Sequence, residues 1–270
     1  MDINHISVSR KKVYDECAQK YKYKYHLKVP SPVEEPFYFI YGKMVHKIAE
    51  EYVRNRGKRT LGEVANDILS GKIEIERGVK APKLPPAYNK RLPGHIRSIQ
   101  SLTEKIGTDG EVEYSFEYDL DPPNEKNIVG FIDRLIFKEE KAFVIDYKTT
   151  KKGKYRVNKN TVKTDLQLRA YARIVQKKFD IEAKNIRVAL HYLEGGDLIA
   201  ASYSDKSLDN IEKELLNAYN QIVEHDPEDV RGKVGYHCQR CEYKTLCPFF
   251  KSSNSRVFWD GDMSKLGFNG

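Results

Sequence analysis

The sequence predicts an α/β fold, in which helices flank both faces of a mixed central sheet. Two observations carry this prediction. The chain begins with helical patterns, and from residue 111 onward strand patterns alternate with further helices. With 270 residues, of which 40% are hydrophobic and 32% charged, the chain is long enough and apolar enough to fold around a core.

The N-terminal part is predicted to form two helices that each carry a residue of chemical interest. Ser7 and Ser9 suit the N-cap of the first helix, in which apolar and aromatic residues recur at spacings of three and four up to residue 21. This helix is expected to carry Cys17. Residues 41–56 read as a second helix with a buried stripe, and it carries His46.

A third helix and an irregular connector are expected next. Residues 61–69 favour a helix. Four prolines between residues 82 and 93 interrupt any regular pattern, so residues 71–95 are predicted to be an irregular connector.

Strands dominate the region that follows. Alternation and β-branched or aromatic residues predict a meander of three strands, at residues 112–120, 128–137 and 142–147. A helix over residues 164–179 comes next, followed by two strands around a Gly-Gly-Asp turn, at residues 186–193 and 198–203. A long helix is expected from residue 207 to just before Pro227.

The charge of the chain favours an acidic partner. Its formal net charge is +8 and its pI is about 9.0, which supports nucleic acid as a partner without identifying it. No run approaches the roughly 20 apolar residues of a membrane helix, and the first residues lack the layout of a signal peptide. We therefore expect a cytoplasmic, intracellular protein without a membrane partner.

Asp133, Asp146 and Lys148 are the most informative residues. Asp146 and Lys148 lie two apart in a predicted strand, so they share a face, and Asp133 lies in the neighbouring strand. Burying such charges is costly unless an ion or substrate compensates them. Two carboxylates beside a lysine suit Mg²⁺- or Mn²⁺-dependent phosphodiester hydrolysis. A structural ion pair is the alternative, and the Asp-x-Lys pattern alone does not exclude it.

Other polar residues add to this cluster. His46 offers a further metal ligand or phosphate contact. Gln167 and Tyr171 lie four apart on a predicted helix, so both face the same way and can orient the lysine or reach a phosphate. Glu113 is a possible additional acidic member, with Glu117 as its competitor on the same strand face.

Taken in chain order, these motifs resemble those of a known nuclease family. Gly-x-x-x-His, an acidic strand, Gly-Phe-Ile-Asp, Ile-Asp-Tyr-Lys-Thr and Gln-Leu-x-x-Tyr are similar to the successive motifs of the RecB-like nucleases of the PD-(D/E)XK superfamily. The resemblance implies a restriction-endonuclease-like core at about residues 111–205. It also implies site roles: metal binding by His46, Asp133 and Asp146, catalysis by Lys148, and shaping of the DNA site by Gln167 and Tyr171.

The chain has four cysteines, Cys17, Cys238, Cys241 and Cys247. Their spacing favours thiolate ligands of a metal over disulfides in an intracellular protein. Zinc remains an alternative, although one distant cysteine with three clustered ones is unlike the paired ligands of structural zinc sites. The pattern resembles the iron–sulfur nucleases of the AddB and CRISPR-associated RecB-like groups, which implies a structural [4Fe–4S] cluster in a subdomain formed by both ends of the chain.

The sequence thus predicts one nuclease domain over residues 1–250 and a polar tail over residues 251–270. The resemblance implies an exonuclease that acts on single-stranded DNA or DNA ends in recombination, repair or CRISPR spacer processing. The chain lacks a Gly-x4-Gly-Lys-Ser/Thr motif, so unwinding would need a helicase partner. The alternatives are a non-catalytic DNA-binding or assembly module and a nuclease stabilised by zinc.

Overall fold

The computed structural model describes residues 1, 3–153 and 156–253, although not the side chains of residues 251–253. The described chain divides into two compact units. The first unit comprises residues 1–35, 119–128 and 213 onward, and the second comprises residues 36–118 and 129–212. The expectation of a single domain over residues 1–250 stays a prediction, and residues 254–270 of the expected tail lie outside the described residues.

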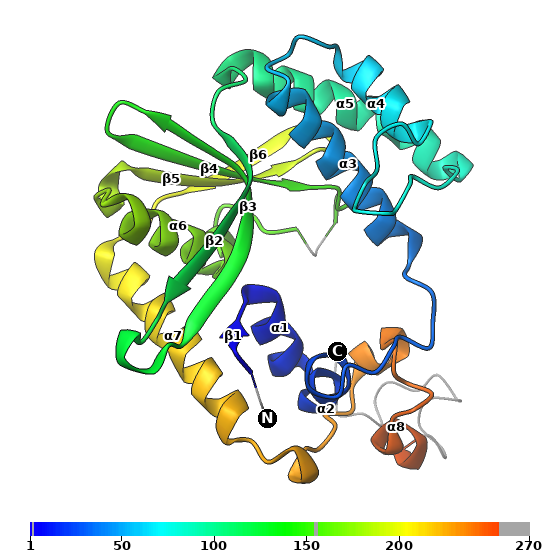
Figure 1. Cartoon of the computed structure of the whole chain (residues 1–270), viewed down its shortest axis with the longest axis vertical. Helices are drawn as coiled ribbons and strands as arrows, with labels where there is room; N and C mark the ends of the chain where they lie inside the picture. Colours follow the sequence, from blue (N-terminus) through cyan, green and yellow to red (C-terminus); the bar gives the residue numbers. More distant parts are fainter. Residues whose placement is uncertain (2, 154–155, 254–270) are drawn as a thin grey trace. The chain divides into compact units, whose positions relative to one another are not determined.

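A six-stranded mixed sheet is the centre of the fold (Figure 1). The sequence predicts a mixed sheet and five of its strands, but not the short first strand at His5–Ile6. Its strands are β1 (His5–Ile6), β2 (Glu111–Asp119), β3 (Asn127–Lys138), β4 (Lys141–Lys148), β5 (Ile186–Tyr192) and β6 (Asp197–Ala201). The order is β1-β3-β4-β5-β6, and β2 also pairs with β3. β4 pairs antiparallel with β3 but parallel with β5, because the chain crosses over between them through a helix.

Three helices of the second unit cover one face of the sheet: α3 (Phe37–Arg54), α4 (Leu61–Leu69) and α5 (Pro86–Ile106). Figure 1 shows them together on one side of β3–β6, with α6 (Leu166–Phe179) on the other. Their apolar stripes pack with Ile136, Ile145 and Tyr147 in one buried cluster. Ile145 and Tyr147 therefore point toward α3–α5, which leaves Asp146 and Lys148 on the opposite face of β4.

Helix α5 corrects the expected connector over residues 71–95. The helix begins at Pro86, where proline is tolerated because the first N–H groups of a helix have no partner within it. It continues through Pro93, since buried residues such as Leu92, His95 and Ile99 anchor it to the core. Packing thus outweighs the loss of one backbone hydrogen bond. Only the part before this helix is irregular.

The first unit brings residues from both ends of the sequence together. It contains α1 (Val8–Glu16), α2 (Ala18–Tyr21), a π-helical turn (Lys22–His26), the end of α7 (Asp205–Glu224) and α8 (Pro248–Ser253). The Met1 ammonium donates to the carbonyls of Ile222 and His225 at 3.1 and 2.8 Å, where a helix end presents unpaired acceptors. Tyr219 Oη donates to Ile3 O at 3.1 Å.

Ser7 caps α1, accepting a hydrogen bond from Arg10 N, as the sequence predicts. The expectation that Cys17 lies within this helix was wrong. The backbone of Cys17 is extended, with φ of −165° and ψ of 113°, and it separates α1 from α2. This break takes the cysteine out of the helical repeat.

Short 3₁₀ turns connect the remaining elements, at Pro122–Asn124, Thr161–Thr164, Ala183–Asn185, Pro227–Asp229 and Tyr236–Arg240. Among the helices of the described chain, none combines the length and the apolar character needed to span a bilayer.

Candidate active site

The polar residues singled out in the sequence meet within the second unit, although they come from five elements. Helix α3 carries His46, β2 carries Glu113, and β3 carries Asp133. Strand β4 carries Asp146 and Lys148, and α6 carries Gln167 and Tyr171. The sheet therefore places side chains that are up to 125 positions apart in the sequence at one site.

His46, Glu113 and Asp133 form the tightest group of possible metal ligands. One ligand atom of each lies within 4.8 Å of the others. His46 Nδ1 is 3.3 Å from Asp133 Oδ2, and the same oxygen accepts a hydrogen bond from Tyr147 N at 2.7 Å. The Asp133 carboxylate is thus fixed by the backbone of the neighbouring strand. Asp146 is not a member of this three-residue group.

Glu113 reaches the group because its backbone departs from regular strand geometry. Its φ is +47°, in the left-handed region that few non-glycine residues adopt. A strand residue in this conformation interrupts the alternation of side chains between the two faces. Glu117, its competitor in the sequence, is exposed. A regular period of two cannot separate these glutamates, so the sequence left this member of the site undecided.

Asp146, Lys148, Gln167 and Tyr171 form a continuous polar chain. Lys148 Nζ lies 2.5 Å from Asp146 Oδ2 and donates a hydrogen bond to Gln167 Oε1 at 3.1 Å. Gln167 Nε2 in turn donates to Tyr171 Oη at 2.8 Å. The spacing of four on α6 therefore brings both side chains to the lysine, as the helical pattern predicts.

Burial and mutual charge control the titration of these groups. Burial raises the pKa of Asp146 to about 6 despite the adjacent Lys148 ammonium. Burial alone would lower the pKa of Lys148, but the carboxylates of Asp146 and Asp133 outweigh it and raise that pKa. Burial likewise opposes the charged form of His46, yet Asp133 raises its pKa to about 9. Burial, and next the charge of Asp133, raise the pKa of Glu113 to about 7.

These residues fit a hard divalent cation. Asp146 is 1% exposed, and three carboxylates with one ammonium and one imidazole leave excess negative charge at this site. Carboxylate oxygens with one imidazole are a ligand set suited to Mg²⁺ or Mn²⁺. A bound cation would stabilise the charged forms of Glu113 and Asp146, whose pKa values are now raised mainly by burial.

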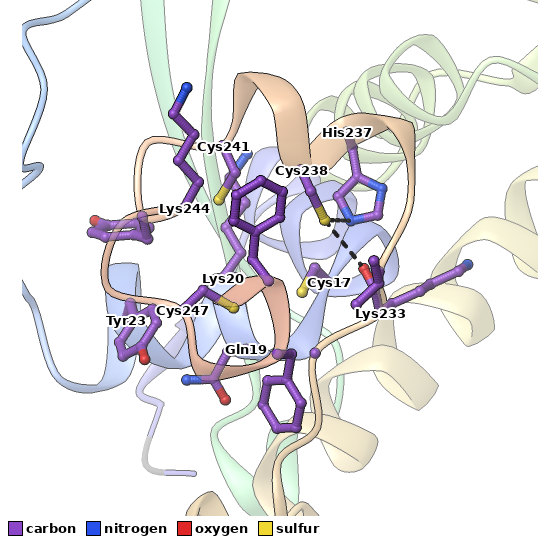
Figure 2. A pocket seen from close by; sticks show the side chains of 15 residues that line it. Cys17, Gln19, Lys20, Tyr23, Lys233, His237, Cys238, Cys241, Lys244 and Cys247 are labelled. Carbon is purple, nitrogen blue, oxygen red and sulfur yellow. Dashed lines mark hydrogen bonds between the residues drawn. The ribbon is translucent and has the colours of Figure 1, made fainter. Parts of the chain in front are cut away.

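The four cysteines lie apart from these residues in the sequence and line one cavity in the first unit. Figure 2 shows their side chains around this cavity, with Lys20, Lys233 and His237 beside them. All four are free thiols. The Cys238 sulfur accepts a hydrogen bond from Gly235 N at 3.4 Å and lies 3.6 Å from His237 Nε2.

The cysteines do not form a compact site for a single ion. Among the described residues, only His46, Glu113 and Asp133 bring three ligand atoms within 4.8 Å of one another, so no three cysteine sulfurs do. A tetrahedral zinc ion, with Zn–S distances of about 2.3 Å, requires sulfurs closer than this limit. The cavity thus gathers four thiols without the geometry of a closed zinc site.

One family profile matches the chain, and solved structures are similar to it. The sequence profile of the PD-(D/E)XK nuclease superfamily matches residues 5–248. The chain is similar to a protein of Eubacterium rectale described as a candidate exonuclease, at 13% identity and a TM-score of 0.49, over 89% of this chain and 88% of that one. It is also similar to the protein SSO0001, at 17% identity and a TM-score of 0.38, over 85% and 94%. No curated protein sequence matches the chain.

Proposed function

We propose a function from one premise: the chain belongs to the PD-(D/E)XK nuclease superfamily, whose profile spans nearly its whole length. The chain is thus a nuclease by family, with nucleic acid as its substrate class. We propose in addition that it hydrolyses DNA with Mg²⁺ or Mn²⁺ as an exonuclease on single-stranded DNA or DNA ends. Recombination, repair and CRISPR spacer processing are the processes in which such an activity fits, beside a helicase or a CRISPR partner.

The observation that carries this proposal is that two clusters lie close enough to interact through their charges. They are the His46–Glu113–Asp133 group and the Asp146–Lys148 pair. His46, Asp133 and Asp146, together with Glu113, would hold the cation. A divalent cation held there would neutralise phosphate charge and acidify a water. Lys148 stabilises the charge that develops on the phosphoryl oxygens, because its ammonium is held next to the carboxylates.

Gln167 and Tyr171 position this lysine. The Gln167 carbonyl accepts from Lys148 Nζ, and Tyr171 fixes the orientation of the Gln167 amide. With Asp146 on its other side, the ammonium is confined from two directions. Such a confined lysine meets the phosphate without reorganisation of its neighbours.

Digestion of end-labelled DNA tests the proposal. Linear single-stranded, linear duplex and circular substrates are followed over time with Mn²⁺, Mg²⁺ or EDTA, and RNA of the same sequence is included. We expect mononucleotides or short products from linear DNA, intact circles and no cleavage in EDTA. Cleavage of circular DNA would show that the protein is an endonuclease and not an exonuclease. Faster cleavage of RNA than of DNA would show that RNA is the substrate.

Two variants assign the activity to the site. Asp146→Ala and Lys148→Ala should each lower the cleavage rate by at least about 1,000-fold while DNA binding persists, because transition-state contacts are lost without opening the core. Lys141→Ala, at the exposed opposite end of the same strand, is the matched control and should cleave normally. A wild-type protein that binds DNA and cuts none under all conditions would instead be a DNA-binding or assembly module.

We also propose that the cysteine cavity holds a [4Fe–4S] cluster with a structural role. The support is the convergence of Cys17, Cys238, Cys241 and Cys247 on one cavity, at separations too large for one zinc ion. A polynuclear cluster holds its thiolates farther apart than a mononuclear site does. Anaerobically purified protein should be brown, with about four iron and four sulfide per chain. A colourless preparation with stoichiometric zinc would establish the zinc alternative.

A further inference from the structure

A charged groove lies along α5 on the second unit, outside the residues described above. It is lined by one face of α5, by Lys151 in the loop after β4, and by residues 193–195 at the β5–β6 turn. We call it the α5 groove. Its α5 residues include Lys90, Gly94 and Arg97, at the i, i+4 and i+7 spacing that aligns side chains along one helix face.

The groove carries cations that the described chain does not neutralise. Lys90, Arg97 and Lys151 are exposed, and no described carboxylate lies within ion-pairing distance of any of them. Arg91 differs, because it pairs with Glu194 at 2.8 Å. The acidic residue of the groove is thus already compensated, and the three remaining cations give the surface a net positive charge.

Gly94 and His95 of α5 lie along the groove. A Cβ at Gly94 would meet no atom closer than Arg97 Nη2 at 4.0 Å, so the helix backbone is open there. His95 is 1% exposed, and burial lowers its pKa to about 4, so its ring is neutral at pH 7. Its Nδ1 bonds Tyr41 Oη at 2.9 Å, while Nε2 has no partner among the described residues. When Tyr41 donates to Nδ1, Nε2 carries the ring proton, and this nitrogen is buried beneath the surface of the groove.

The groove adjoins the chain that leaves the catalytic strand. Arg91 Nη2 donates to Thr149 O at 2.8 Å, and Thr149 directly follows Lys148. Lys151, on the groove rim, is three residues beyond Lys148. The rim of the groove is therefore formed in part by the chain that directly follows Lys148.

We propose that the α5 groove binds the phosphodiester backbone of the nucleic-acid strand that is being cleaved, on one side of the scissile phosphate. This inference rests on the proposed function and deepens it. Lys90 and Arg97 lie about 10 Å apart along the helix axis. This exceeds the axial spacing of about 3.4 Å between successive phosphates of one strand in duplex DNA, so the two cations can meet different phosphates of one strand. Cations in such a line suit a linear polyanion better than a single phosphate.

The salt dependence of DNA binding tests the groove without relying on cleavage. Affinity for a 20-nucleotide single strand is measured by fluorescence anisotropy in Ca²⁺ between 50 and 300 mM salt, for wild type and for Lys90→Ala/Arg97→Ala. Each lost phosphate contact lowers the slope of log K against log salt by about 0.7 for single strands. The double variant should lose about 1.4 from this slope and bind about 25-fold more weakly at 0.1 M salt.

The matched control is Lys138→Ala/Lys141→Ala, which removes the same charge at the turn between β3 and β4. Both residues are exposed and lie at the opposite end of β4 from Lys148. This variant should keep the wild-type slope and affinity. Equal slopes for the two double variants would overturn the groove proposal. The proposal would also fail if poly-glutamate of matched charge displaced the labelled DNA as strongly as unlabelled DNA does, because the groove would then suit an acidic peptide.

Cleavage assays separate this inference from the proposed function. If wild-type protein cuts DNA in Mn²⁺ and the two double variants bind alike, the nuclease stands and the groove proposal fails. If wild-type protein cuts nothing, while only Lys90→Ala/Arg97→Ala loses the salt-dependent affinity, the groove stands and the nuclease proposal fails. Trinucleotides, which are too short to span both sites, should be cut equally by wild type and by the groove variant.

Discussion

Glu113 provides a test at the scale of one residue, because a second glutamate on the same strand serves as its control. Its left-handed backbone directs the carboxylate to His46 and Asp133, whereas Glu117 is exposed. We expect Glu113→Gln to weaken Mn²⁺ binding and cleavage by about 10- to 100-fold, as loss of a metal contact does. Glu117→Gln should match wild type in Mn²⁺ titrations and DNA digestion. A reversed result would assign the site to Glu117.

Most residues of this site could be predicted from the sequence, but Glu113 could not. Asp133, Asp146 and Lys148 were identifiable because charges in otherwise apolar strands are costly without a partner. The link from Lys148 to Gln167 follows from regular strand and helix periods. Glu113 was not decidable, because one irregular φ changes the direction of its side chain and no residue type in the sequence marks that position.

His46 gives a second test, in the pH dependence of metal binding. Burial alone would lower its pKa, but Asp133 raises it to about 9 in the metal-free protein. Between pH 7 and 9 the ring is therefore protonated, and a metal ion must displace one proton to use it as a ligand. The apparent Kd for Mn²⁺ should fall about tenfold per pH unit in this window and level off above pH 9.

Calorimetry in buffers of different ionisation enthalpy counts the protons released. At pH 8 we expect about one proton per Mn²⁺ bound by the wild type and none by His46→Gln, which has no proton to displace. Below pH 7 the release should increase, because the pKa of Glu113 is raised to about 7. Metal binding at pH 8 without proton release would remove His46 from the ligand set.

Among the elements, β3 carries a packing constraint that reaches the site. A Cβ on Gly130 would lie 2.6 Å from Phe116 Cζ, and the Phe116 ring packs edge-on against Tyr171 at 6.1 Å between centroids. Gly130→Ala should therefore cost about 1–3 kcal/mol through overpacking. The melting temperature should fall by about 2–12 °C in calorimetry. Phe116→Leu should recover part of this loss in the double variant.

Gly62 on α4 is the matched control for this substitution. Its nearest neighbour to an added Cβ is Thr60 Oγ1 at 3.9 Å, so the position has room. Gly62→Ala should be neutral or stabilising by up to about 1 kcal/mol, because glycine is unfavourable within a helix. Equal melting temperatures for both alanine variants would show that Phe116 moves aside without cost.

The elements themselves were predictable where local pattern and packing agree. Strands β2 to β6 and α4 follow from alternation and a helical stripe, whereas the two-residue β1 is too short to show a pattern. Helix α5 was missed, because its prolines argue locally against a helix, while buried side chains such as Leu92 and Ile99 stabilise it through contacts that no local pattern reveals. Likewise, the break at Cys17 has no signal in the surrounding helical periodicity.

At the scale of the whole molecule, the four cysteines can hold the two ends of the chain together. The first unit contains residues 1–35 and residues from 213 onward, so Cys17 and Cys241 belong to segments more than 200 positions apart. A cluster that joins them removes conformational freedom from the unfolded chain, as a long-range crosslink does. A crosslink over a loop of this length stabilises by up to about 5 kcal/mol. We therefore expect Cys241→Ala to lose its iron and to lower the melting temperature by about 10 °C.

Asp146→Ala separates this effect from catalysis, because it removes a residue of the second unit and leaves all four cysteines in place. It should abolish cleavage while its iron content, visible absorption and melting temperature remain close to wild type. Cys241→Ala should show the opposite pattern at low temperature, with residual cleavage by the protein that is still folded. If Cys241→Ala melts at the wild-type temperature, the cysteine cavity does not stabilise the chain, and a role in electron transfer or partner binding would have to account for the four thiols.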